Sequence, residues 1–595
     1  MKTGLFRAAV IVFCFFPLCL TYPKPDIKFF TSDGYTKSSL FIRNQARLDA
    51  NRVDTWIQNS GTFNQDLRTN NTPGLMWPKG SNRYASFTAG ISIGTYVEGQ
   101  LKLAVCSYMG EYEPGYINIS GGVPSPVTNT DFKFYKVTST DSSSYDYLNW
   151  GLMIPYGAPY VDRNNNGVYD QGIDRPGIKN AVQTIFICMT DGFPETHNQS
   201  EGFSGGTAPV FSEMRLTAWA YSKGDSLSPD PVNDIQFLSY VIINKSTKNW
   251  DSTMISVVSD PDLGDGSDDF IGCDTTLNLG YIYNADNFDG TGSVPSYGLN
   301  PPSSGISYLL SPAYYTGSIN DTVIYYDPPG SNNKIIKPRY RELGMTSFTY
   351  FAKSSGGNLS CEAEPGTQIE AYRFLSGLKK DGSMWFHPST KQRTRKVYPG
   401  NPETREGWTE FGYNGAVNMA VIKSCAGGDS TSTYMSVPSD RRYLINTGGK
   451  NYKVNAGDTV RIILGQMVAR GTSNVNSVTK LRNVCLTAKD IYRSNFAVRV
   501  SSISESVPES FSLGQNYPNP FNASSRIQFQ VRDYENVKIT VYGLLGNELA
   551  TLVNEKLKPG TYETEFDGSS FGSGVYFYRI TAGSFTQTRK MILIK

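Results

Sequence analysis

Histidine is almost absent from this chain of 595 residues, which contains two, His197 and His387. These two histidines lie far apart in the sequence and cannot form the H-E-x-x-H pattern of zinc proteases, and they leave little material for a serine or cysteine nucleophile that needs an imidazole base. The sequence also lacks a P-loop and a dinucleotide-binding glycine motif. These absences argue against the common hydrolases and nucleotide-dependent enzymes.

Net charge is nearly absent as well, because 55 basic residues face 53 acidic ones. Two of the basic residues, Lys2 and Arg7, lie in a segment that we expect to be removed, which brings the balance to zero. Such a balance gives no reason to expect nucleic acid or an anionic membrane surface as a partner. After residue 20 no stretch approaches the roughly eighteen apolar residues of a membrane span, so we expect no transmembrane segment.

A short apolar run at residues 8–20 follows Lys2 and Arg7. It is too short to span a bilayer and is typical of a signal-peptide core, so residues 1–21 are predicted to be a signal peptide. Exported chains can form disulfides. We expect one or two bridges and otherwise buried thiols, with the pairing left open, among the cysteines that remain: Cys106, Cys188, Cys273, Cys361, Cys425 and Cys485.

The remaining sequence predicts a mostly β protein, because aromatic residues are frequent and glycine and proline punctuate short strand-like runs. We expect β-sandwich-like cargo domains at residues 22–235 and 236–500. One segment has helical periodicity instead. Its apolar positions recur every three or four residues and predict an amphipathic helix with Cys485 in the core: Val478, Leu481, Val484, Cys485, Ala488, Ile491 and Tyr492.

The last part of the chain differs in texture. A polar stretch at residues 501–512 is predicted to be a linker. Beyond it, residues 513–595 contain alternating strand-like runs at 526–531, 537–542, 561–566 and 575–580, separated by glycine-containing turns. This spacing predicts a C-terminal immunoglobulin-like sandwich.

Four motifs follow in order in this module: NYPNPFN at 516–522, VYGLLGN at 541–547, GSGVYFY at 572–578 and KMILIK at 590–595. Together they closely resemble the type A C-terminal sorting domain of the type IX secretion system, with Ala523 where that family often has proline. The resemblance implies that the type IX machinery is a partner and that the protein is secreted or lies on the outer cell surface. A sorting domain says almost nothing about what its cargo does.

The cargo also resembles, at residues 72–80, 87–90 and 259–265, segments of large secreted β-rich proteins that carry the same sorting domain. This resemblance transfers no biochemical activity.

The strongest chemical motif is a loop that begins at Asp162. Side-chain oxygens stand at its positions 1, 3, 5 and 9, Gly167 stands where an EF-hand-type loop turns sharply, and Val168 offers a backbone carbonyl. Position 12 is Ile173, with Asp174 one residue late. Calcium wants six to eight oxygens, so we expect a structural calcium ion here, with an ordinary solvated turn as the alternative: Asp162, Asn164, Asn166, Val168, Asp170 and Asp174.

A second acidic run lies between residues 260 and 269. Carboxylates this dense repel one another unless a cation or solvent screens them. The run is therefore a second calcium candidate, and its alternatives are a solvated acidic loop and a paired-carboxylate glycosidase site. Its members are Asp260, Asp262, Asp265, Asp268 and Asp269.

Ser204 lies in a G-x-S-x-G pattern, but its neighbours are typical of a loop, whereas a nucleophile elbow joins a strand to a helix. We therefore expect a non-catalytic secreted or surface protein, structural or adhesive and stabilised by calcium. Extracellular glycans or surface proteins are its candidate partners. The alternative function is a secreted polysaccharide hydrolase that uses Asp or Glu carboxylates.

Overall fold

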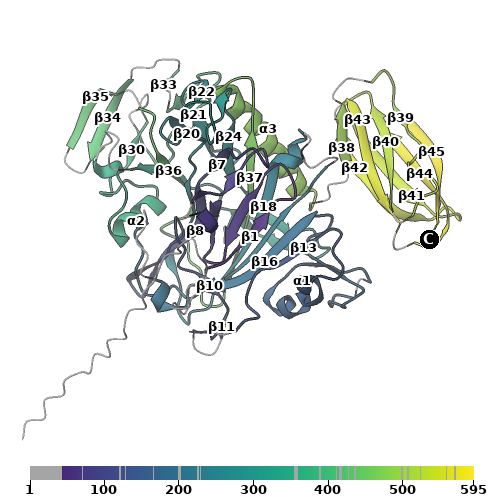
Figure 1. Cartoon of the computed structure of the whole chain (residues 1–595), viewed down its shortest axis with the longest axis horizontal. Helices are drawn as coiled ribbons and strands as arrows, with labels where there is room; N and C mark the ends of the chain where they lie inside the picture. The colour runs from purple at the N-terminus through teal and green to yellow at the C-terminus, as the bar shows by residue number, and fades with distance from the viewer. Residues whose placement is uncertain are drawn as a thin grey trace, which may run out of the picture.

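The computed structural model shows a large β-rich cargo region followed by a smaller C-terminal sandwich (Figure 1). The structure describes residues 43–594 except for short gaps at 70–71, 119–121, 127–128, 165, 198–202, 224–226, 228, 354–359, 388–389, 391, 411, 415–418, 426–427, 435–436, 497–499, 505–507, 523, 558 and 569–570. The predicted signal peptide, residues 1–21, lies outside the described residues. The mostly β fold class is confirmed.

Two antiparallel sheets dominate the cargo. The eight-stranded sheet contains β1 (Gln45–Leu48), β2 (Thr55–Gln58), β3 (Thr62–Phe63), β8 (Thr88–Val97), β9 (Gln100–Ala104), β19 (Asp251–Asp260), β29 (Ser347–Ala352) and β36 (Arg441–Gly448). The nine-stranded sheet contains β10 (Glu113–Pro114), β13 (Tyr135–Thr138), β16 (Gln183–Thr190), β17 (Ser212–Ala220), β18 (Ile235–Asn244), β20 (Asp269–Asp274), β21 (Leu279–Asn284), β24 (Ser303–Leu310) and β37 (Thr459–Ala469).

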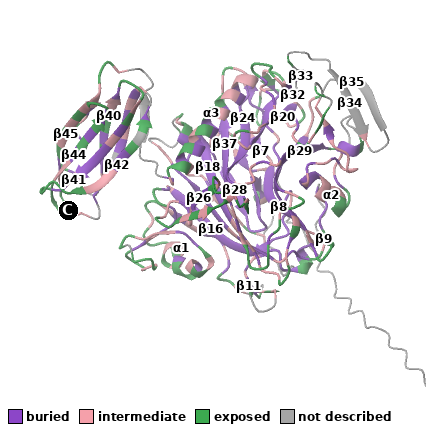
Figure 2. Cartoon of the chain, turned by 180° about the vertical axis from the view of Figure 1, so that it is seen from behind, coloured by how far each residue is buried: buried purple, intermediate pink, exposed green. Residues whose placement is uncertain are grey.

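The main core lies between these two sheets. It combines Ile93 and Val257 of the eight-stranded sheet with Leu216, Tyr240 and Leu464 of the nine-stranded sheet, all essentially buried. Two apolar faces that meet in this way make a sandwich. Figure 2 shows the buried residues running through both sheets.

The two cargo domains expected on either side of residue 235 are not separate in the fold. β8 pairs with β19, and β18 pairs with β37 more than two hundred residues later. Each large sheet therefore takes strands from both sides of the expected boundary, and the cargo is one two-sheet unit. Strand pairing between distant segments produces this arrangement, and local sequence patterns do not encode it.

Helices cover the outer faces of the sheets. The predicted amphipathic helix is confirmed as α3 (Asn474–Arg493), whose buried residues pack with Trp219 and Tyr281 of the nine-stranded sheet. The shorter α2 (Gln368–Leu375) buries Phe374 and Leu375 against the eight-stranded sheet. Near the edge strand β13, α1 (Tyr145–Leu148) and the 3-10 helix η2 (Trp150–Tyr156) enclose a small aromatic core around Trp150.

Short strand pairs and turns complete the cargo. The pairs are β4 (Gln65–Asp66) with β5 (Thr72–Pro73), β6 (Leu75–Met76) with β7 (Tyr84–Ser86), β11 (Ile117–Asn118) with β12 (Val123–Pro124), β14 (Tyr160–Val161) with β15 (Arg175–Pro176), β22 (Phe288–Asp289) with β23 (Gly298–Leu299), β25 (Ala313–Tyr315) with β28 (Tyr340–Glu342), β26 (Thr322–Tyr326) with β27 (Lys334–Pro338), β30 (Trp385–Phe386) with β31 (Arg393–Thr394), β32 (Trp408–Thr409) with β33 (Gly412–Tyr413), and β34 (Met419–Cys425) with β35 (Gly428–Tyr434). The other 3-10 helices are η1 (Leu67–Thr69), η3 (Pro194–Thr196), η4 (Pro231–Asp234) and η5 (Ser360–Glu362).

The C-terminal module consists of two four-stranded antiparallel sheets around its own core. One sheet contains β38 (Val500–Ser504), β39 (Ser512–Leu513), β40 (Ser524–Val531) and β43 (Gly560–Asp567), and the other contains β41 (Glu535–Tyr542), β42 (Glu548–Leu557), β44 (Gly574–Ala582) and β45 (Phe585–Leu593). Part of the predicted linker is therefore a strand, because β38 pairs with β43. That the sandwich is immunoglobulin-like stays a prediction.

Cysteine usage follows the expectation of few bridges. Cys361 and Cys425 form a disulfide, with Cα atoms 5.6 Å apart. Four further cysteines are buried free thiols: Cys106, Cys188, Cys273 and Cys485.

Candidate functional site

The loop that begins at Asp162 connects β14 to β15. The carboxylate of Asp162 accepts hydrogen bonds from the backbone N–H of Gly167 at 2.8 Å and of Asn166 at 3.3 Å. Gly167 has φ +78°, a left-handed conformation that glycine adopts without a Cβ clash. The chain therefore turns around the Asp162 carboxylate, as the sequence predicts.

Polar side chains converge on the other side of this loop. The side-chain amides of Asn164 and Asn166 donate to one oxygen of Asp170, at 2.8 Å and 2.6 Å. These two donors lower the pKa of Asp170, which stays a carboxylate at neutral pH. The structure thus brings together four of the predicted oxygen-bearing side chains.

The two other residues predicted for this loop have different positions. Asp174 is buried, and its carboxylate accepts the backbone N–H groups of Arg163 and Asp170, each at 2.8 Å. It therefore fixes the two ends of the loop. The side chain of Val168 is 62% exposed, and its backbone N–H donates to Asn166 at 2.9 Å.

The second acidic run divides into two groups. In the first group, Asp265, Asp268 and Asp269, each carboxylate accepts at least one hydrogen bond from a backbone N–H. Asp265 accepts from Ser267, and Asp268 accepts the N–H of Gly290 at 2.9 Å. Asp269 is buried and accepts the N–H of Leu263 at 2.9 Å. These hydrogen bonds hold the loop between β19 and β20 and satisfy part of its carboxylate oxygens, although Oδ1 of Asp269 is buried without a hydrogen-bond partner.

The second group consists of Asp260 and Asp262, which approach Asp440 from a distant part of the chain. One carboxylate oxygen from each of the three residues lies within 4.8 Å of the other two. Sequence reasoning missed Asp440, because only the pairing of β19 with β36 brings it here. Three hard oxygen donors at this spacing suit a divalent cation.

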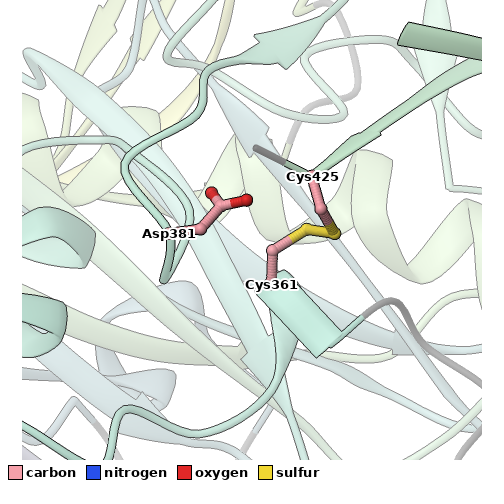
Figure 3. A group of neighbouring side chains, drawn as sticks. All are labelled: Cys361, Asp381 and Cys425. Atoms are coloured by element: carbon pink, nitrogen blue, oxygen red, sulfur yellow. A yellow bond between two sulfur atoms is a disulfide. The ribbon is translucent and has the colours of Figure 1, made fainter. Parts of the chain in front are cut away.

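A third cluster of side chains consists of Cys361, Asp381 and Cys425. Figure 3 shows Asp381 beside the disulfide of Cys361 and Cys425. Metal binding by cysteine needs the thiolate, and the bonded sulfurs have none. This cluster is therefore no metal site; its disulfide is a covalent bond between η5 and β34.

The surroundings of Ser204 agree with a loop. Among the described residues from 203 to 211 there is no helix or strand, so no nucleophile elbow is formed. The nearby His197 is buried between the carboxylates of Glu111 and Asp191, with nitrogen–oxygen distances of 3.3 Å and 3.5 Å. These carboxylates outweigh the effect of burial and raise the pKa of His197 to about 10. An imidazole with so high a pKa is protonated at neutral pH and is not available as a general base there.

The motif residues of the C-terminal module occupy structural positions. The backbone N–H of Asn516 donates to the Tyr578 hydroxyl at 2.8 Å, and that hydroxyl donates to the carbonyl of Gly514 at 2.8 Å. Phe521 bridges to Leu593 at the end of the last strand. The first and third motifs are thereby connected, and the end of the chain is held in the same sandwich.

The comparisons with known proteins agree with this module. The family described as a secretion system C-terminal sorting domain matches residues 515–595. A search of curated proteins finds no match for the chain. Among the described residues, no helix is long and apolar enough to cross a membrane. The chain therefore ends in a C-terminal sorting domain of the type IX secretion system, and the protein is secreted or displayed on the outer cell surface.

Proposed function

We propose that the cargo is a non-catalytic extracellular protein, structural or adhesive, that binds calcium in the loop from Asp162 to Asp174. The observation that carries the proposal is the convergence of Asn164 and Asn166 on the Asp170 carboxylate, opposite the turn around Asp162. An amide can present its oxygen in place of its NH₂ group after rotation about its terminal bond. Two amide oxygens would then join the Asp170 carboxylate, and the Asp162 carboxylate across the loop would add to an oxygen-rich set that suits a hard cation.

The supporting elements of the loop favour a structural role for this ion. β14 and β15 hold its two ends together, and Gln171 donates to the carbonyl of Leu148 at 2.8 Å. This hydrogen bond already joins the loop to the neighbouring α1, and a bound ion would fix the conformation of the loop between its two strands. Extracellular modules bind calcium at roughly 10⁻⁴–10⁻³ M, so millimolar calcium would stabilise the folded state by on the order of 1 kcal/mol.

The hydrolase alternative receives less support. Among the described residues, the three carboxylates whose oxygens lie within 4.8 Å of one another are those of Asp260, Asp262 and Asp440. Asp260 is only 2% exposed, so a polysaccharide has little access to it. The oxygens of these three residues are also closer together than the roughly 5–9.5 Å separations of glycosidase carboxylates. We therefore propose that glycans or surface proteins are binding partners of this cargo and not its substrates.

The experiment measures calcium bound to the full chain by equilibrium dialysis. The test variant carries Asp162→Asn and Asp170→Asn, which keep side-chain size and remove the two carboxylates proposed as ligands. We expect it to bind one calcium ion fewer than the wild type. The control is Asp141→Asn, because Asp141 also accepts backbone N–H groups, from Ser143 and Ser144, but lies outside the loop. Equal binding by all three proteins would contradict the calcium site.

A further inference from the structure

The eight-stranded sheet brings carboxylates together where two of its strands meet. β19 ends at Asp260 and β36 begins at Arg441, and the two strands pair antiparallel with Ser259 opposite Tyr443. The residues just beyond this last pair therefore lie at one end of the sheet. They include Asp262 after β19 and Asp440 before β36.

The deepest member of this group has an unsatisfied oxygen. Asp260 is 2% exposed, and its Oδ2 accepts the hydroxyl hydrogen of Tyr108. Its Oδ1 is buried and has no hydrogen-bond partner. A buried carboxylate oxygen without a partner is costly, so a ligand with positive charge is the expected complement.

The neighbouring cations do not balance the group. Arg442 approaches Asp260 at 3.5 Å, Asp440 at 2.8 Å and Glu364 at 3.7 Å. Lys353 adds a favourable interaction with Asp262. Four carboxylates thus face two basic side chains. Burial raises the pKa of Asp262 to about 6, with the Asp440 carboxylate adding to it, and raises the pKa of Asp260 well above its usual range.

We propose that Asp260, Asp262 and Asp440 bind a divalent cation, calcium. Asp260 forms the floor of the site, while Asp262 and Asp440 are half-buried and leave an approach for the ion and its water. The hydroxyl of Ser439, next to Asp440, is another buried oxygen without a hydrogen-bond partner. The ion would join the loop after β19 to the segment that enters β36, and it would balance the excess of carboxylates.

This site is independent of the loop that begins at Asp162, since the two share no residue. Calcium alone is the probe, with the full chain in equilibrium dialysis at pH 7.5. Three further proteins are compared with the wild type: the loop variant with Asp162→Asn and Asp170→Asn, the cluster variant with Asp262→Asn and Asp440→Asn, and the control Asp265→Asn. Asp265 belongs to the same acidic run but accepts from Ser267.

We expect the loop variant to keep one calcium ion and the cluster variant to lose that ion. The control should bind as many ions as the wild type. Calcium binding that disappears entirely in the loop variant would overturn the proposal and leave the proposed function intact. A cluster variant that binds as much as the wild type would also overturn it. If the cluster variant does not fold, the count for the loop variant decides alone.

Discussion

His197 is held as a buried cation, and its replacement is the sharpest test of the electrostatics of this fold. The side chain is 1% exposed, and its Nε2 donates to the carbonyl of Asp191 at 2.8 Å. The two flanking carboxylates are themselves fixed by the backbone, since Glu111 accepts from Val105 at 2.8 Å and Asp191 accepts from Val210 at 2.6 Å. Without the imidazolium, two carboxylates would remain buried and uncompensated.

The magnitude follows from the pKa of His197, which rises from 6.5 to about 10. The folded state then binds the proton more tightly than the unfolded state, and each pKa unit corresponds to about 1.4 kcal/mol. The contribution, about 5 kcal/mol at its largest, is fully present below pH 6.5. It falls to about 3 kcal/mol near pH 8 and is lost as the pH rises through about 10. We expect His197→Gln to lower the free energy of unfolding by about 3–5 kcal/mol near pH 7.

Urea unfolding at pH 6, 8 and 10 measures the difference between wild type and variant. The matched control is His387→Gln, because the other histidine is partly exposed beside Trp408 and burial lowers its pKa. With two histidines in the chain, carbon-13 labelling of histidine gives two NMR titrations to compare. One imidazole should stay protonated up to about pH 10, and the other should titrate below 6.5. Two imidazoles that both titrate near 6.5, or a His197→Gln variant as stable as the wild type at pH 7, would refute the reasoning.

Two further predictions concern the tie at Cys361 and the sorting domain. Cys361→Ala removes a disulfide between residues 64 apart in sequence, and the lost restriction of the unfolded chain predicts a destabilisation of at most about 4 kcal/mol. Melting curves with and without reductant should differ for the wild type and coincide for the variant. A wild type whose melting curve does not change with reductant would contradict this. Tyr578→Phe leaves the buried backbone N–H of Asn516 without its acceptor, so we expect the stability of the C-terminal sandwich to fall by about 1–3 kcal/mol. The measurement is amide hydrogen exchange, which should become faster in this sandwich. Unchanged exchange there would show that the hydroxyl is dispensable.

Local periodicity was enough to predict several elements. The apolar stripe through Leu481 and Cys485 identified α3, because one face of a helix on a sheet must be apolar over its whole length. The alternation at 526–531 and 537–542 likewise identified β40 and β41, which bury every second residue over part of their length. In these segments the spacing of apolar residues shows which side chains are buried, so the element can be predicted without knowing its partner in the fold.

Long-range pairing explains what the sequence did not predict. The division of the cargo at residue 235 failed because β18, which begins there, is flanked by β17 and by β37 in the middle of a sheet. The polar stretch at 501–512 predicts a linker, yet the backbone of its first residues, 501–504, pairs with β43. Backbone hydrogen bonds form a strand whatever the side chains are, so a serine-rich sequence hides such a strand.

The acidic run shows most clearly why charge density alone does not locate a cation site. Asp265 and Asp268 occur in the same ten residues as Asp260, but they accept hydrogen bonds from Ser267 and from the N–H of Gly290. Asp269 resembles Asp260 in that one of its buried oxygens has a donor and the other has none. Asp260 finds the Tyr108 hydroxyl for one oxygen and no hydrogen-bond donor for the other. The difference lies in the neighbouring carboxylates, because the pairing of β19 with β36 brings Asp440 to Asp260 and Asp262, whereas among the described residues Asp269 belongs to no such group of three. The register of β19 against β36 must therefore be known before any of these carboxylates can be assigned to a metal.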